Sequence, residues 1–250
     1  MQMKQRAIMA TALHGYSALK EICDHSFEGI TYGQKSMNYF VSENARMIRA
    51  TAPDVNLSTY KGIAVSNAYI IAKGSLPSVE LIGNPDNSYF SIDQNLTGTF
   101  TFAQLMGYFG ASMIGDMVTF VALIDNPGTD ASVYWLRLKL TENNKAKSFT
   151  ASESPNIIAS LSEGTDFETN IDNFTAGDFA ISYNNDGKKI TIAVSDSLSQ
   201  SMGVILSRKS DAGWLRSSSK MVNLQATFNY AEALATYPEN GEKILNGGNV

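Results

Sequence analysis

The sequence has little of what most catalytic and metal-binding sites require. Its single cysteine, Cys23, allows neither an intramolecular disulfide nor a cysteine-based zinc site. The two histidines, His14 and His25, are accompanied by no Glu-x-x-His or comparable metal-binding spacing. The sequence also lacks a Gly-x-Ser-x-Gly motif and a glycine-rich phosphate loop. We therefore expect a non-enzymatic protein with no cofactor and no bound metal.

Charge and long apolar runs are also scarce. Charged residues make up 17% of the chain, below the usual quarter, whereas 44% of residues are apolar, which allows a substantial core. The net charge of −5 argues against a surface that wraps nucleic acid as a whole, but is compatible with a local basic patch. No apolar run approaches the ~18 residues of a membrane span, and the N-terminus lacks a secretion-signal cleavage site. We expect an intracellular protein, or part of a particle assembled inside a cell.

Two N-terminal helices are predicted from the spacing of apolar side chains. In residues 3–25 and again in residues 34–50, these side chains recur in steps of three and four. The short connection between the two segments favours an antiparallel pair, which would form a domain of residues 1–52. A short internal helix is predicted at residues 101–109, because Thr101 and Gln104 have capping-box spacing.

The rest of the chain is predicted to be rich in β-strands. Residues 117–124 are apolar enough to be buried on both faces of a sheet. Further strands are predicted at residues 62–72, 78–82, 89–92, 132–141, 178–183, 188–194, 202–209 and 213–216. The expected fold class is α+β: the helical pair followed by a mainly antiparallel β-sandwich, Ig-like or related.

The domain organisation follows from these elements. The β-domain would span residues 60–237, with a division into two sub-sandwiches near residues 126–131 as an alternative. It would end in a short helix at residues 230–237, followed by a flexible tail at residues 238–250.

The hairpin of residues 203–220 is the best candidate for binding. Four cations surround one indole there: Arg208, Lys209, Arg216 and Lys220 around Trp214. Such a ribbon could contact phosphates and stack a base, or anchor a contact between subunits. It could equally be a solvated hairpin with one tryptophan in the core.

Two further groups of residues have alternative interpretations. The acidic run Asp166, Glu168, Asp172 and Asp178 could gather around calcium, although its spacing misses the EF-hand loop, or could form a solvated loop. Trp135 could contribute to a glycan-binding platform or face the core, and the alternation around it does not decide between these orientations.

Several short blocks spread over most of the chain resemble a family of uncharacterised Bacteroidota proteins, a domain of unknown function. The blocks are Gln2 to Ala7, His25 to Gly29 with Gln34 to Ser36, Lys73 to Pro77, Gly115 to Phe120, Ser207 to Lys209, and Trp214 to Ser217. The family's Gly-rich N-terminal segment is missing from this sequence. The resemblance implies a helix-plus-β-sandwich building block, associated with mobile or phage-like genes, and implies no activity or functional residue.

We interpret the sequence as that of a non-enzymatic structural or interaction protein, a candidate subunit of a phage-like or other self-assembling particle. Its partners would be copies of itself or other structural proteins. The first alternative is a nucleic-acid-binding protein that uses the hairpin of residues 203–220. The second is a glycan-binding β-sandwich with an exposed aromatic platform.

Overall fold

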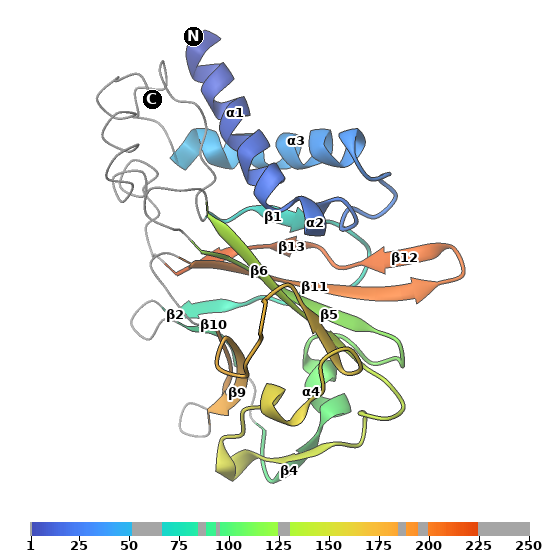
Figure 1. Cartoon of the computed structure of the whole chain (residues 1–250). Helices are drawn as coiled ribbons and strands as arrows, with labels where there is room; N and C mark the ends of the chain where they lie inside the picture. Colours follow the sequence, from blue (N-terminus) through green and yellow to red (C-terminus); the bar gives the residue numbers. More distant parts are fainter. Residues whose placement is uncertain are drawn as a thin grey trace.

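The computed structural model describes residues 2–51, 67–84, 89–93, 96–124, 131–184, 189–194 and 200–224. The fold is mixed and mostly β, with antiparallel strands in several sheets (Figure 1). The α-helices of this part are α1 (Gln2–Ala18), α2 (Lys20–Cys23), α3 (Gln34–Thr51) and α4 (Phe102–Tyr108).

The largest sheet has the strand order β12-β11-β5-β6-β8, and β14 pairs with β11 beside it. Its strands are β5 (Met117–Ile124), β6 (Ser132–Lys139), β8 (Phe167–Thr169), β11 (Gln200–Ser210), β12 (Gly213–Arg216) and β14 (Val222–Asn223). A second sheet has the order β2-β3-β10-β9. It consists of β2 (Ile82–Asn84), β3 (Tyr89–Asp93), β9 (Phe179–Asn184) and β10 (Lys189–Val194).

Two small antiparallel pairs complete the strands. One joins β1 (Ile70–Ala72) to β13 (Ser219–Lys220), and the other joins β4 (Thr99–Thr101) to β7 (Ser148–Thr150). Short 3-10 turns at Ala151–Glu153 and Ile158–Ser160 follow β7.

Strand β5 separates two hydrophobic clusters. Phe120 and its alternate neighbours belong to a cluster with α4 and the second sheet, whereas Val121 and Leu123 belong to a cluster with the N-terminal helices. Figure 1 shows α1 and α3 on one side of the large sheet and α4 and β4 on the other. The predicted burial of residues 117–124 on both faces is confirmed, because only Met117 is less than fully buried.

The N-terminal helices pack on the sheet of their own chain. Phe40 of α3 is fully buried, and its ring lies 5.7 Å from that of Tyr69, just before β1. Gly15 of α1 faces the same tyrosine, because a Cβ atom there would lie 3.2 Å from its ring. Cys23 is buried in this layer, with its sulfur 3.7 Å from the Ile71 carbonyl oxygen, and burial raises the pKa of its thiol. The buried apolar side chains of the N-terminal helices therefore pack against the sheet of the same chain.

The outer edge of β1 is closed by a side chain. Asn44 of α3 accepts a hydrogen bond from the Ile70 amide at 2.8 Å and donates one to the Ile70 carbonyl at 3.0 Å. Its amide group also donates to the Phe40 carbonyl at 3.0 Å. Asn44 is fully buried, so that one amide side chain takes the place of a neighbouring strand.

Several predicted elements are confirmed. The second helix is α3, the internal helix is α4 with the predicted Thr101–Gln104 capping box, and β11 and β12 form the predicted hairpin. The first helix is divided at Leu19. The strand predicted at residues 78–82 is wrong, because only Ile82 lies in a strand and the preceding residues have no ladder partner. The predicted helix at residues 230–237, the tail at 238–250 and residues 126–130 lie outside the described residues.

Candidate interaction surface

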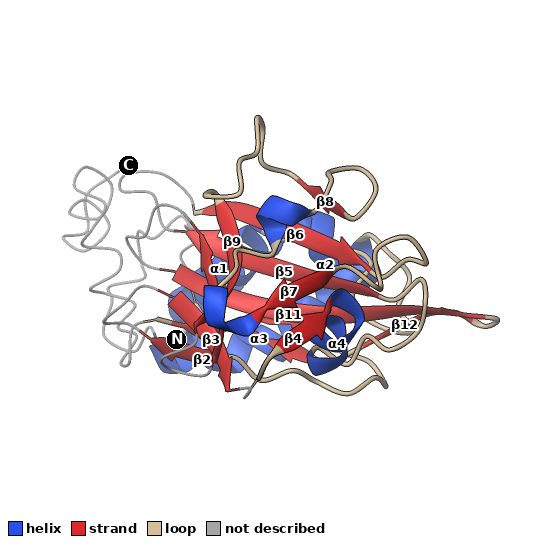
Figure 2. Cartoon of the chain, turned by 90° about the horizontal axis from the view of Figure 1, so that it is seen from below, coloured by secondary structure: helices blue, strands red, loops and turns tan. Residues whose placement is uncertain are grey.

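The hairpin of β11 and β12 extends beyond the neighbouring strands (Figure 2). Its register pairs Lys209 with Trp214 and Ser207 with Arg216. Because alternate residues of a strand share a face, the side chains of Lys209, Trp214 and Arg216 lie on one face. That face is turned toward the connection between α2 and α3 (residues 24–33), because the Arg216 Nε donates to the His25 carbonyl at 2.9 Å.

A small hollow lies between the hairpin and this connection, and we call it the hairpin notch. It has a volume of about 210 Å³, and its lining includes Asp24, His25, Glu28, Tyr32, Trp214 and Arg216. Trp214 is 43% exposed and Tyr32 is 74% exposed. The centre of the Arg216 guanidinium lies 5.1 Å from the Trp214 ring, and the rings of His25 and Tyr32 are 5.9 Å apart. The notch thus has aromatic groups on both sides and a cation between them.

Glu28 fixes the base of the hairpin against the connection. Its carboxylate accepts hydrogen bonds from the Ser75 amide at 2.9 Å and the Arg216 amide at 3.0 Å. These bonds favour the ionised form and lower the pKa of Glu28. The Leu76 amide donates to the Arg216 carbonyl at 2.9 Å. The outer edge of β12 is therefore closed at Arg216.

Asp24 fixes the other side of the notch. It accepts hydrogen bonds from the Tyr16 hydroxyl and from the Gly33 amide, which lies 3.0 Å away. Burial opposes its ionisation, but these two bonds, together with the nearby Lys20 and His25, lower the pKa of Asp24. Burial and the nearby Asp24 raise the pKa of Tyr16. The connection that carries Tyr32 is thereby attached to α1.

Arg216 has no ion-pair partner within the described residues. Its Nε and Nη1 donate only to backbone carbonyls, those of His25 and Leu215. Burial and the nearby Arg137 lower its pKa, and Glu28 acts in the opposite direction. Arg137, by contrast, pairs with Glu168 at 3.3 Å. The notch therefore contains a partly buried positive charge without a carboxylate on its guanidinium.

Arg208 lies on the opposite face of the hairpin and is bound to a buried carboxylate. Its Nε and Nη2 donate to Asp116 at 2.8 and 2.6 Å. Asp116 is 1% exposed and also accepts hydrogen bonds from the amides of Ser112 and Met113, each at 2.9 Å. This pairing raises the pKa of Arg208. Arg208 thus holds the turn before β5 and does not contribute to the notch.

Lys220 is also separate from the notch. It belongs to β13 and pairs with Ile70 of β1. There it lines a different hollow of about 750 Å³, together with Glu43 and Lys73. Of the five predicted site residues, the structure therefore brings together Lys209, Trp214 and Arg216.

Glu28 and Tyr32, which line the notch together with Trp214, were not predicted from the sequence. Glu28 and Arg216 are 188 residues apart in the chain, and no spacing relates them. Tyr32 offered only a weak signal, as an aromatic residue in a short connection between two helices.

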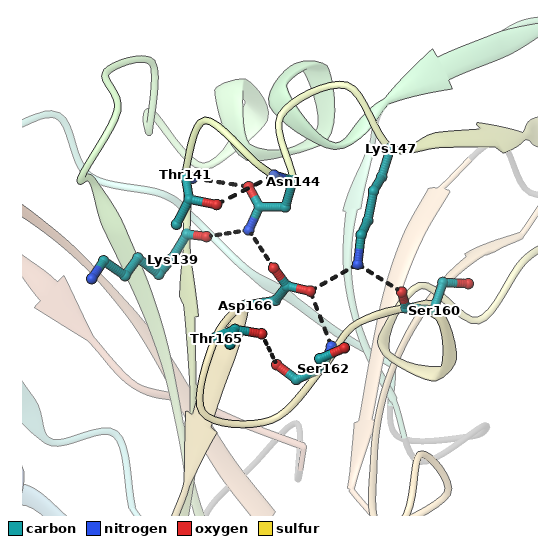
Figure 3. A network of polar contacts seen from close by, with 8 residues as sticks. All are labelled: Lys139, Thr141, Asn144, Lys147, Ser160, Ser162, Thr165 and Asp166. Atoms are coloured by element: carbon teal, nitrogen blue, oxygen red, sulfur yellow. Dashed lines mark hydrogen bonds and ion pairs between the residues drawn. The ribbon is translucent and has the colours of Figure 1, made fainter.

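Three residues of the acidic run, Asp166, Glu168 and Asp178, form separate contacts. Asp166 accepts hydrogen bonds from Lys147 at 2.8 Å, Asn144 at 3.0 Å and the Ser162 amide at 3.0 Å (Figure 3). This network joins the loop after β6 to the loop before β8. The described part of the chain contains no group of three or more His, Cys, Asp or Glu side chains placed to hold a metal ion.

Trp135 faces the core. It is 8% exposed, belongs to the cluster under the N-terminal helices and has the Arg137 guanidinium 4.9 Å from its ring. Trp214 and Tyr32 are therefore the exposed aromatic pair that this region offers.

Comparison with protein-family models, curated proteins and solved structures finds no match to this chain. Among the described residues, no helix is both long enough and apolar enough to cross a membrane.

Proposed function

We propose that the protein is a non-enzymatic structural protein that self-associates through the hairpin notch, as a subunit of a larger, phage-like or related assembly. One observation carries this proposal. Trp214, Tyr32 and Arg216, from distant segments, gather on one exposed surface. Tryptophan, tyrosine and arginine are the residue types that most often dominate the binding energy of protein interfaces.

The hydrogen bonds of Glu28 and Asp24 hold the notch in place, which favours binding without rearrangement. Glu28 and Asp24 each accept hydrogen bonds from donors on two different segments. Groups that are already ordered lose less conformational entropy on association. A surface held in this way is suited to repeated contacts between identical subunits.

For the architecture, we infer that the two larger sheets form an antiparallel β-sandwich, Ig-like or related. Side chains of both sheets share one hydrophobic cluster, and the rings of Phe120 in β5 and Phe179 in β9 are 6.1 Å apart. Facing sheets that share a core are the defining feature of a sandwich. An experimental structure that separated these sheets would contradict this inference.

Light scattering on a sizing column tests self-association. We expect the mass of the wild-type protein to exceed that of a monomer and to rise with concentration. The double variant Trp214→Ser, Tyr32→Ser should remain monomeric, whereas Met9→Ser, at a 39% exposed site on α1, should behave as wild type. A wild-type protein that stays monomeric at all concentrations would contradict the proposal.

Nucleic-acid binding is the second candidate, because Lys209, Trp214 and Arg216 share one face of the hairpin. Its support is weaker than the sequence suggests, since Arg208 is paired with Asp116 and Lys220 lies elsewhere. Absorbance at two wavelengths during the same experiment would detect bound nucleic acid. Salt-sensitive retention on single-stranded DNA, lost when Lys209 and Arg216 are replaced, would favour this candidate.

A further inference from the structure

We propose that the hairpin notch of one copy receives Asp211 from the hairpin tip of a second copy, in a twofold-symmetric contact. Asp211 of each copy would pair with Arg216 of the other. This inference rests on the proposed self-association and specifies its geometry.

Two opposite charges of one hairpin are unpaired within the described residues. Asp211 is exposed in the turn between β11 and β12 and forms no ion pair there. Arg216 is partly buried at the other end of β12, and its guanidinium donates hydrogen bonds to carbonyls alone. The two residues are five positions apart, so that they are separated by roughly 15 Å along the strand. They cannot neutralise each other within one extended hairpin.

A twofold axis between two copies would bring Asp211 of each copy close to Arg216 of the other. If two hairpins lie antiparallel, with the axis near the midpoint between Asp211 and Arg216, the tip of each meets the base of the other. That midpoint lies between Gly213 and Trp214, so the two exposed indoles would meet near the axis. Isologous contacts are self-complementary in this way, and dominant residues cluster at the centre of an interface.

The notch offers one cation, whereas a phosphodiester chain needs a series of cations along its path. Arg216 is the one arginine or lysine among the residues that line the notch. The carboxylates of Asp24 and Glu28 in the same lining already accept hydrogen bonds from the amides of Gly33, Ser75 and Arg216. A single carboxylate could pair with the guanidinium while its neighbours contact Trp214 and Tyr32. The hairpin tip carries such an isolated carboxylate.

Charge reversal tests this pairing. We expect Asp211→Lys and Arg216→Glu each to weaken association by about tenfold or more, because like charges would then face each other at both contacts. In an equimolar mixture, Lys at position 211 of one variant faces Glu at position 216 of the other, and the second contact is wild type. The mixture should therefore associate as the wild-type protein does. Glu163→Lys, at an exposed position outside the hairpin, serves as the control and should associate normally.

Each outcome has a distinct meaning. Asp211→Lys alters only an exposed turn, so that its effect does not depend on whether Arg216→Glu folds. If the wild-type protein associates and the variants associate equally well, the pairing is overturned while self-association stands. Variants that weaken association without recovery in the mixture also overturn the pairing. A monomeric wild type overturns the proposed function and this inference together, and DNA binding that is lost only in Arg216→Glu would replace both with the nucleic-acid candidate.

Discussion

The guanidinium of Arg208 and the carboxylate of Asp116 form a two-pronged ion pair across 92 residues of sequence, with the carboxylate 1% exposed. This pair joins the projecting hairpin to the turn that begins β5. A residue that looked like a surface cation in the sequence is therefore part of the framework.

Removing this cation should destabilise the protein. Arg208→Met leaves a buried carboxylate without its charge partner, which typically costs about 3–5 kcal/mol. We expect a lower urea midpoint with an unchanged slope. Lys145→Met, which breaks the exposed pair between Lys145 and Glu142, should cost less than about 1 kcal/mol. Equal effects of the two substitutions would contradict the framework role of Arg208.

Acid should weaken the fold partly through Asp116. Burial opposes its ionisation, but hydrogen bonds from Arg208, Met113 and Ser112 outweigh burial and lower its pKa in the folded protein. The aspartate pKa of the unfolded chain is about 3.9. At pH values between the folded and the unfolded pKa, the unfolded chain therefore binds more protons at this site than the folded protein does. The contribution to stability is complete above about pH 3.9 and is lost as the pH falls through the folded pKa.

Urea titrations between pH 2 and 8 would measure this dependence. Asp116→Asn should show a smaller loss of unfolding free energy below about pH 4 than the wild type does. Between pH 6 and 8, the two proteins should share the same slope. If the unfolding free energy of the variant fell as steeply below about pH 4 as that of the wild type, the acid sensitivity would belong to other groups.

Asn44 offers a test of the closed edge of β1. Asn44→Ala would leave the amide and carbonyl of Ile70 without their side-chain partner. We expect a loss of about 2–4 kcal/mol, since each orphaned buried group costs about 1–3 kcal/mol. Asn38→Ala removes only an exposed contact with Gln34 and should change stability by less than about 0.5 kcal/mol. Thermal and urea unfolding of the two variants would check both values.

Two glycines should respond to alanine in opposite directions. A Cβ atom at Gly74 would lie 2.1 Å from the Arg216 carbonyl oxygen, so that the base of the hairpin must move. We expect Gly74→Ala to cost about 1–3 kcal/mol and to weaken self-association, because Glu28 and Arg216 would shift. Gly107 lies in α4, and a Cβ atom there meets nothing within 4 Å. Gly107→Ala should therefore stabilise the protein by about 0.5–1 kcal/mol.

The predictable parts of the fold are those with local causes. The cap of α4 depends on Thr101 and Gln104, three residues apart, and the β11–β12 hairpin depends on one tight turn. The contact between Asn44 and Ile70 has no local cause, because a polar residue in an amphipathic helix usually indicates the solvated face. The strand expected at residues 78–82 has suitable side chains, but a strand also requires a partner at hydrogen-bonding distance, and residues 78–81 have none.

In the candidate site, too, the features with local causes were predictable and those that depend on distant residues were not. Trp214 and its neighbouring cations were identified because they lie in one hairpin. Which cations remain available was decided by distant carboxylates: Asp116 engages Arg208, whereas Glu28 binds the backbone amide of Arg216. Composition records how many charges a chain has, but the tertiary structure determines which of them are already neutralised.

The buried Cys23 provides a natural probe for the opening of the N-terminal helical layer. Its thiol is the only one in the chain and lies where α2 meets β1, so a thiol-specific reagent can reach it only when the helical layer lifts from the sheet. The rate of labelling would then report how often that layer opens. The labelling rate could be compared between the free subunit and the assembly without any engineered probe. A slower rate in the assembly would show that self-association suppresses the opening of the helical layer, and an equal rate would show that the layer opens independently of assembly.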